Sequence, residues 1–332
     1  MRKEFDLMSD VSFVIPCYNE AGNVRAVYDA IHQVFDPEGI RVQTVFVNDG
    51  SKDGTKEALD QLFRDVLGKA DIKVIHFSRN FGKEAAILAG LKNADAVYYC
   101  LIDADLQQRP EVALQMYKIL EQDPAKDMVA AYQDKRHESK SLSFFKKNFY
   151  WTINRLSDIE FRQDTSDFRM FSETVRNAIL SMPEYHRFTK GIFAFIGFET
   201  EFIPYEVEER HSGESSWSFK KLFRYALEGI TGYTTKPLVF PIYGGIALIF
   251  SAVLYLILRL VIGNATGHPG DGFTAVITLV LLLFGMLFIS IGILGNYLAK
   301  TYIQSKERPV YIVKQMLEGK QDAADDDTQE AR

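Results

Sequence analysis

Two long uncharged stretches constrain this 332-residue chain more than any other feature. The first, Leu238–Leu258, has 21 residues and the second, Phe273–Ala299, has 27. A helix needs about 20 apolar residues to cross the hydrocarbon of a bilayer. Core helices of soluble proteins rarely run as long without a charge, so the two stretches predict a hairpin of membrane-spanning helices.

The positions of lysine and arginine predict the direction of this hairpin. The connector GNATGHPGDG has neither residue type. Basic residues flank the outer ends instead: Lys220, Lys221, Arg224, Lys236, Lys300, Lys306, Arg308 and Lys314. By the positive-inside rule both termini face the cytoplasm of a plasma (inner) membrane. Before the first span, SFKKLFRYALEGITGY alternates basic and apolar residues, which is typical of a helix on an anionic leaflet or of an ordinary packing helix.

The residues before the hairpin repeat a short apolar run, a turn and a helical pattern. The runs cover residues 11–16, 42–47, 72–77, 97–103 and 127–132. Strands that alternate with helices predict an α/β domain with a mostly parallel sheet, covered on both faces. The expected organisation is a catalytic domain (1–217), an amphipathic helix (218–236), a first span (237–262), an outer loop (263–272), a second span (273–299) and an acidic tail (300–332).

Polar clusters follow four of the expected strands: PCYNE, NDGSKDGT, SRNFGK and DADLQ. Ligands of such sheets bind at the carboxyl ends of the strands, so an active site is expected there. Asp49 could accept hydrogen bonds from a base or a ribose, or form a plain Asp-Gly turn. Asp103 and Asp105, with Gln107 beyond, offer hard oxygens to Mg²⁺ or Mn²⁺, which usually also binds substrate phosphates.

Several other functions lose support. A net charge of −6 argues against nucleic-acid binding. Neither a G-x-G-x-x-G nor a Walker A pattern occurs, which disfavours dinucleotide and P-loop chemistry. The six histidines have no spacing typical of metal ligands.

The ordered motifs resemble the A-type inverting glycosyltransferases of family 2, and among them the polyprenyl-phosphate glycosyltransferases related to dolichyl-phosphate mannose synthase. The similarity runs through VSFVIPCYNE, VFVNDGSKDGT, HFSRNFGKEAAILAGL, LIDADLQ, MPEYHRFTKGIFAFIGF, ERHSGESSWSFKKLF, the two spans and KERPVYIV. The fold that this resemblance implies is a Rossmann-like A-type domain followed by the membrane hairpin. The resemblance covers about 310 residues of the chain.

The resemblance also implies roles for individual residues. The residues expected to bind the nucleotide sugar are Pro16, Tyr18, Glu20, Asp49, Lys83 and Asp103. The metal ligands would be Asp103, Asp105 and Gln107. The family's Gly-Asp-Phe-Arg segment reads Ser166-Asp167-Phe168-Arg169 here, so Asp167 joins Asp105 as an expected catalytic residue. Serine in place of the glycine is a departure that concerns the local backbone.

The lipid phosphate of the acceptor would need basic residues near the membrane. The residues expected to bind it are Lys135, Arg136, Lys146, Lys147 and Arg210. The first four lie among aromatic residues in DKRHESKSLSFFKKNFYWTI, and a solvated charged face is the alternative for each. Arg210 belongs to a family segment in which Ser216 replaces a lysine.

The function implied is inverting transfer of glucose or N-acetylglucosamine from a UDP-sugar to undecaprenyl (polyprenyl) phosphate, for modification of a cell-envelope glycan. Expected partners are the lipid bilayer, a flippase, a downstream membrane transferase and, by analogy, further copies in a homotetramer. The alternative is a membrane-anchored nucleotide-sugar sensor or scaffold without transfer activity. A processive polysaccharide synthase would carry Q-x-x-R-W, which this chain lacks.

Overall fold

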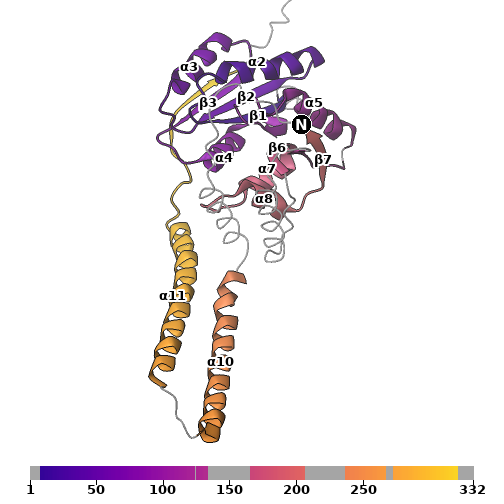
Figure 1. Cartoon of the computed structure of the whole chain (residues 1–332). Coiled ribbons are helices and arrows are strands. Elements are labelled where there is room, and N and C mark those ends of the chain that lie inside the picture. The colour runs from indigo at the N-terminus through magenta and orange to yellow at the C-terminus, as the bar shows by residue number, and fades with distance from the viewer. Residues whose placement is uncertain (1–7, 124, 134–164, 206–235, 267–271, 321–332) are drawn as a thin grey trace, which may run out of the picture. The chain divides into compact units, whose positions relative to one another are not determined.

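The computed structural model describes residues 8–123, 125–133, 165–205, 236–266 and 272–320 (Figure 1). The chain divides into two compact units. The first comprises Met1–Tyr150, Phe161–Ser218 and Pro309–Arg332, and the second comprises Trp151–Glu160 and Phe219–Arg308.

The first unit is built on one mixed sheet, which has eight strands among the described residues, in the order β7-β5-β6-β4-β1-β2-β3-β8. The strands are β1 (Ser9–Cys17), β2 (Val42–Asn48), β3 (Asp71–Phe77), β4 (Ala96–Leu101), β5 (Met128–Gln133), β6 (Thr165–Ser172), β7 (Thr200–Tyr205) and β8 (Val313–Gly319). The helices are α2 (Val24–Phe35), η1 (Asp36–Glu38), α3 (Thr55–Val66), α4 (Lys83–Asn93), α5 (Pro110–Gln122), α7 (Glu173–Leu180) and α8 (Thr189–Ile196).

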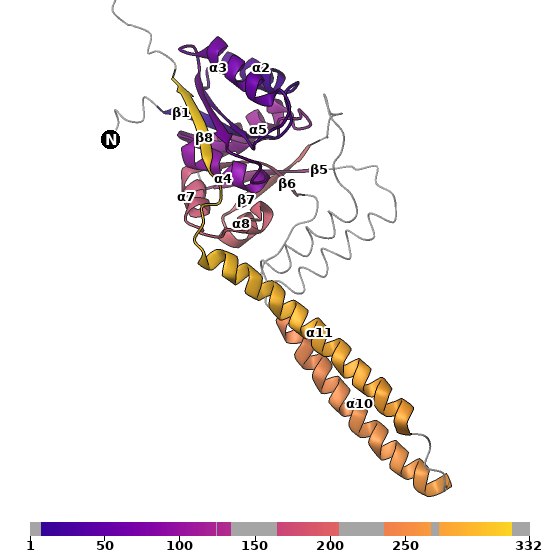
Figure 2. The same ribbon diagram turned by 90° about the vertical axis from the view of Figure 1, so that its left-hand side faces the viewer.

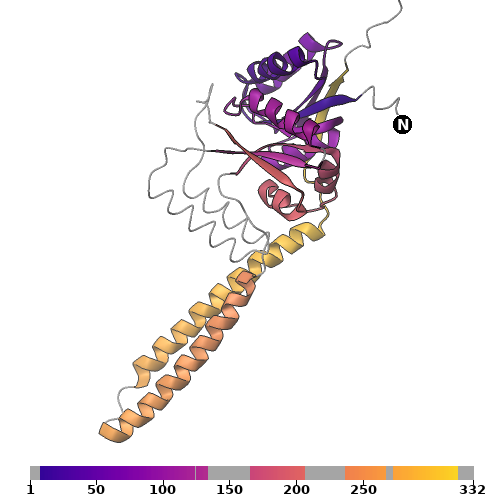
Figure 3. The same ribbon diagram turned by 90° about the vertical axis from the view of Figure 1, so that its right-hand side faces the viewer.

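Helices cover both faces of this sheet, as the views in Figures 1 and 3 show. Helices α2, α3 and α5 pack on one face, and α4 and α7 pack on the other. All seven residues of β2 are buried, as is typical of a central parallel strand with helices on both sides. The alternating α/β pattern predicted from the sequence is therefore confirmed.

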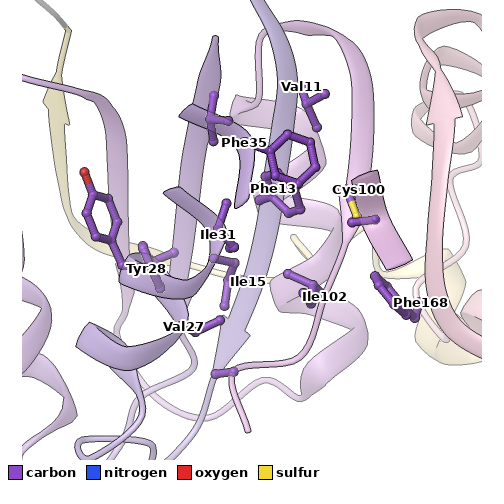
Figure 4. Packing of buried hydrophobic residues seen from close by; sticks show 14 of the residues in the cluster. Val11, Phe13, Ile15, Val27, Tyr28, Ile31, Phe35, Cys100, Ile102 and Phe168 are labelled. Carbon is purple, nitrogen blue, oxygen red and sulfur yellow. The ribbon is translucent and has the colours of Figure 1, made fainter. Parts of the chain in front are cut away.

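The core between β1 and α2 follows from the two sequence periods. Phe13 and Ile15 alternate along β1, and Ile31 and Phe35 lie four residues apart on α2. Figure 4 shows these side chains packed together, and the Phe13 and Phe35 rings meet edge to face at 5.0 Å. On the opposite face α4 approaches closely at Gly90, where an added Cβ would lie 2.3 Å from Val14 Cγ1.

Three strands escaped the sequence prediction, and two of them change how the sheet is paired. Strands β1 to β4 pair in parallel, whereas β6 pairs antiparallel with β4 and β8 pairs antiparallel with β3. Strand β8 lies in the stretch expected to be a cytoplasmic tail, and Figure 2 shows it along the sheet edge. Its side chains are largely exposed, so it lacks the apolar run of a central strand.

The second unit contains α10 (Lys236–Thr266) and α11 (Gly272–Ser305), which lie side by side in Figures 1 to 3. The backbone of Gly244 approaches Met286, because an added Cβ would lie 2.9 Å from its Cε. Among the described residues, Leu282–Ser305 is the one helical stretch long and apolar enough to cross a membrane, and none of it is buried. Pro241–Tyr255 of α10 is shorter. The expected amphipathic helix of residues 218–236 falls almost wholly outside the described residues.

Candidate active site

The two acids that follow β4 are held by hydrogen bonds within their own loop. Gln108 is 5% exposed, and its Oε1 accepts the backbone N–H of Asp103 at 2.9 Å. Its Nε2 donates to Asp103 Oδ2 at 3.2 Å. Asp105 Oδ1 accepts the N–H of Gln107 at 3.2 Å, and Leu106 between them has a φ of 61°. Such a left-handed, non-glycine residue costs backbone energy and is typical of functional loops.

Lys83 joins two of the predicted site residues. Its Nζ lies 2.7 Å from Asp103 Oδ1 and 3.4 Å from Asp167 Oδ2. Burial alone would lower the pKa of Lys83, but the charges of Asp103 and Asp167 outweigh it and raise the pKa. Lys83 therefore stays an ammonium between the two carboxylates. The structure thus brings together residues from α4, the β4 loop and β6.

The two carboxylate oxygens of Asp167 have different surroundings. Its Oδ1 is buried and has no hydrogen-bond partner among the described residues. Burial would raise the pKa of Asp167, yet Lys83, Lys190 and Arg169 together lower it. Asp167 is therefore ionised at neutral pH, with Oδ2 paired to Lys83 and Oδ1 buried without a hydrogen-bond partner in the described part of the chain.

Arg169 supports the strand that carries Asp167. It is 3% exposed, its Nη2 donates to the carbonyl of Ser166 at 2.9 Å, and its guanidinium lies 3.8 Å from the centre of the Phe193 ring. Burial lowers the pKa of Arg169 to about 10, which still leaves it charged at neutral pH. Ser166, the departure from the family glycine, has no positive φ, and its Oγ accepts the N–H of Phe168 at 3.2 Å.

Asp49 holds a neighbouring loop, and its role in nucleotide binding stays a prediction. It is 3% exposed, and its two oxygens accept the backbone N–H groups of Phe81 at 2.6 Å and of Gly82 at 2.9 Å. Burial raises the pKa of Asp49 in spite of these bonds. Gly50 has a φ of 59°, and an added Cβ would lie 2.3 Å from the backbone of Arg79. Asp49 thus fixes the loop that ends at Lys83.

The first strand-end cluster is tied to the second. The N–H of Asn19 donates to Ser51 Oγ at 3.0 Å, and the N–H of Glu20 donates to Thr55 Oγ1 at 2.8 Å. Tyr18 beside them is 44% exposed. Pro16 lies within β1 opposite Val47. The roles of Pro16, Tyr18 and Glu20 in nucleotide binding stay predictions.

Sequence reasoning missed Gln108 and a buried acid next to Lys83. Glu84 Oε2 accepts the N–H of Thr189 at 2.9 Å and also the Thr189 hydroxyl, so it ties α4 to the start of α8. Burial and the charge of Asp167 raise the pKa of Glu84 to about 7. The sequence feature that could have identified Glu84 is its position directly before the apolar run AAILAG.

The predicted lipid-phosphate residues lie outside the described residues: Lys135, Arg136, Lys146, Lys147 and Arg210. Gln107 is described through its backbone bond to Asp105, and its place as a metal ligand stays a prediction. Among the described residues, no group of three His, Cys, Asp or Glu side chains could hold a metal by itself. The carboxylates of Asp103 and Asp105 fit a hard cation that takes its remaining ligands from substrate phosphates.

An acidic, lysine-linked cluster at the strand ends of an α/β sheet is the kind of site that phosphate-bearing donors require. The model of the family described as glycosyl transferase family 2 matches residues 12–179, about half of the chain. The chain belongs to glycosyl transferase family 2 and is a glycosyltransferase.

Relatives of known name match almost the whole chain. The putative glycosyltransferase CsbB of Bacillus subtilis is 34% identical over 92% of this chain and 91% of its own. The bactoprenol glucosyl transferase of Shigella phage SfV is 33% identical over 92% of this chain and 98% of its own. Among solved structures, glucosyl-3-phosphoglycerate synthase of Mycobacterium tuberculosis with Mn²⁺, UDP and phosphoglyceric acid is 16% identical, over 67% of this chain and 76% of its own, with a TM-score of 0.49.

Proposed function

We propose that this glycosyltransferase moves a hexose, glucose or N-acetylglucosamine, from a UDP-sugar to a polyprenyl phosphate at the cytoplasmic face of a membrane. The observation that carries the proposal is the Asp103–Lys83–Asp167 cluster, in which one oxygen of Asp167 has no partner among the described residues. The names of the bactoprenol glucosyl transferase relatives support the lipid acceptor.

The acceptor needs no strong general base. A phosphate monoester has a second pKa near ~6, so it is largely ionised at neutral pH and is already a nucleophile. One of its oxygens attacks the anomeric carbon while the bond from that carbon to the UDP oxygen breaks. Attack from the face opposite UDP inverts the configuration, so an α-linked donor gives a β-linked lipid product.

Asp167 is suited to the reaction centre because it is ionised and partly unpaired. Positive charge develops at the anomeric carbon as UDP leaves, and a fixed carboxylate beside it stabilises that charge. The same carboxylate could orient the acceptor. Lys83 pairs with Asp103 on the donor side, so its ammonium is placed to contact the diphosphate.

Asp103 and Asp105, with Gln107, would hold Mg²⁺ or Mn²⁺ together with the donor phosphates. A divalent cation in that place neutralises charge on the departing UDP. We expect Asp105→Asn to abolish metal-dependent transfer while the chain stays folded. Asp123→Asn, at an exposed acid after α5, is the matched control. Near-normal turnover of Asp105→Asn in Mg²⁺ and Mn²⁺ would remove this residue from the metal site.

The place of β8 in the chain supports a hairpin of two spans. β8 follows α11 and hydrogen-bonds to β3, so the chain starts and ends on one side of any bilayer that residues 206–312 cross. An even number of crossings is therefore required. With α11 as one crossing, α10 is the other long apolar helix available, although its shorter stretch Pro241–Tyr255 would need flanking residues to span the hydrocarbon.

The lipid phosphate would bind close to the membrane, where the aromatic and basic stretch of residues 134–151 is expected. The lipid product would then require a flippase and a membrane transferase to use the sugar on the other side. A homotetramer is the assembly that we expect by analogy with relatives.

A panel of labelled UDP-sugars tests the function directly. The purified full chain is incubated with each donor, Mg²⁺ or Mn²⁺ and undecaprenyl phosphate, and the lipid is extracted. Label in the organic phase with one donor is the expected result and identifies the sugar. Nucleotide-sugar binding without any transfer would favour the alternative, a membrane-anchored sensor or scaffold.

A further inference from the structure

The motif KERPVYIV is unexplained by the proposed chemistry, yet its tyrosine packs against the end of β3, next to the loop that leads to Lys83. Tyr311 lies six positions after the last residue of α11 and just before β8. Its ring stacks on that of Phe77, the last residue of β3, with centroids 5.0 Å apart and planes 13° apart. The neighbouring Ile312 accepts the backbone N–H of Ser78 at 3.0 Å.

These contacts continue into the loop that precedes Lys83. The edge of the Phe81 ring meets Phe77 at 5.7 Å, with the ring planes at 89°. The Arg79 guanidinium lies 4.7 Å from the centre of the Phe81 ring. The N–H groups of Phe81 and Gly82 are those that Asp49 accepts. The loop of residues 78–82 is therefore held by Asp49, which follows β2, and by Tyr311 and Ile312, which precede β8.

The pairing of β8 with β3 is irregular at the same place. Val313 lies opposite Phe77 and Gln315 lies opposite His76, so Lys314 is an extra residue in the ladder. Such bulges bend a strand and redirect its neighbours, and they are common beside active sites. Further along, Lys73 and Glu318 form an ion pair at 3.0 Å that fixes the remaining register. The bulge thus falls where β3 gives way to the loop.

We propose that Tyr311 and Ile312, the C-terminal brace, are positioning residues for the donor site: through Phe77 and Phe81 they hold the loop that presents Lys83 to Asp103 and Asp167. The inference rests on the proposed donor role of Lys83. It means that the segment leaving α11 completes the nucleotide site. A glycosyltransferase of this kind would lose donor affinity when that segment is displaced, even with every acidic residue in place.

Variants of the full-length chain in detergent test the brace, with UDP and Mn²⁺ as the titrated ligand. Tyr311→Ala should raise the Kd of UDP–Mn²⁺ and the KM of the UDP-sugar about tenfold, in line with the loss of an aromatic pair. The KM of the lipid acceptor should stay within about twofold. Tyr311→Phe keeps the ring and should restore both donor values.

Tyr117→Ala is the matched control, because Tyr117 also contacts another aromatic ring. Its ring meets that of Tyr98 edge to face at 5.8 Å. It should leave the Kd of UDP–Mn²⁺ unchanged. If Tyr311→Ala fails to fold, Tyr311→Leu keeps the apolar bulk without the flat ring and carries the same expectation. Folded Tyr311→Ala or Tyr311→Leu with wild-type donor affinity overturns the brace, as does equal weakening of donor binding in Tyr117→Ala.

Lys83→Ala separates failure of the brace from failure of the proposed function. Weak donor binding by Lys83→Ala together with normal binding by Tyr311→Ala refutes the brace and leaves the donor site intact. Wild-type donor binding by Lys83→Ala refutes the donor role of Lys83 and the brace with it. Absence of UDP binding by the unaltered chain has the same consequence, because the brace depends on that donor.

Discussion

Asp49 follows β2 and Asp167 lies near the start of β6, two strands of one sheet that are separated by β4 and β1, and their carboxylates make different contacts. Both oxygens of Asp49 accept backbone N–H groups of the loop before Lys83. Asp167 contacts Lys83 through one oxygen and keeps the other without a partner among the described residues. The comparison teaches that an acid at a strand end can hold the backbone of a site or act on its ligand, and that the partners of its two oxygens distinguish the two roles.

Asp167→Asn should give the largest effect in this comparison. The variant keeps the size of the side chain and loses its charge, so kcat should fall about 10³-fold, as for removal of a group that stabilises transition-state charge. Thermal stability should also fall, because Lys83, Lys190 and Arg169 lower the pKa of this carboxylate, so that its charge stabilises the fold. Transfer of labelled sugar and a melting curve measure the two quantities. An unchanged rate would remove Asp167 from the catalytic residues.

Asp49→Ala should act mainly on stability. It leaves the buried N–H groups of Phe81 and Gly82 without their acceptor, which should lower the free energy of unfolding by about 3 kcal/mol. Denaturant titration of the full chain measures the loss. Asp65→Ala, at an exposed acid on α3, should cost far less. A stable Asp49→Ala variant with weakened UDP binding would instead assign Asp49 the ligand role that the sequence predicted.

The same residues show which parts of the fold and of the site could be predicted from the sequence. Short apolar runs located β1 to β5 and placed Asp49, Lys83 and Asp103 after the strands, whereas Asp167 was identified only from the family resemblance because its strand β6 was missed. The pattern could not tell that both oxygens of Asp49 are occupied, because that depends on where the backbone of residues 81 and 82 passes. Gln108 was missed for the same reason. Strand β8 was missed because an exposed edge strand needs no apolar run.

Glu84→Gln tests the buried acid that neighbours Asp167. Burial and the charge of Asp167 raise the pKa of Glu84 from 4.5 to about 7 in the folded chain. The stability that this group contributes is therefore fully present below pH 4.5 and is lost as the pH rises through about 7. The complete loss amounts to about 3 kcal/mol.

Glutamine stays neutral at every pH and can still accept a hydrogen bond from Thr189. The free energy of unfolding of Glu84→Gln should accordingly fall less than that of the unaltered chain between about pH 5 and pH 8. Denaturant titrations at a series of pH values provide the measurement, and Glu173→Gln on α7 is the control. If the free energies of unfolding of the two chains changed in parallel with pH, Glu84 would be ionised in the folded chain at neutral pH. Asp167 would then have a second negative charge beside it.

Ser166→Gly should have the smallest effect and tests the remaining difference between the two acidic regions. Gly50 beside Asp49 is required by its positive φ and by the close backbone of Arg79, whereas Ser166 beside Asp167 has an ordinary φ and accepts the N–H of Phe168. Glycine there should lower stability by about 1 kcal/mol through added freedom of the unfolded chain and the lost hydrogen bond, with kcat within about twofold. Ser166→Ala removes the hydroxyl alone and separates the two contributions. A large rise in kcat for Ser166→Gly would mean that the serine restrains Asp167, and the strand would then control the reactive carboxylate more tightly than its hydrogen bonds indicate.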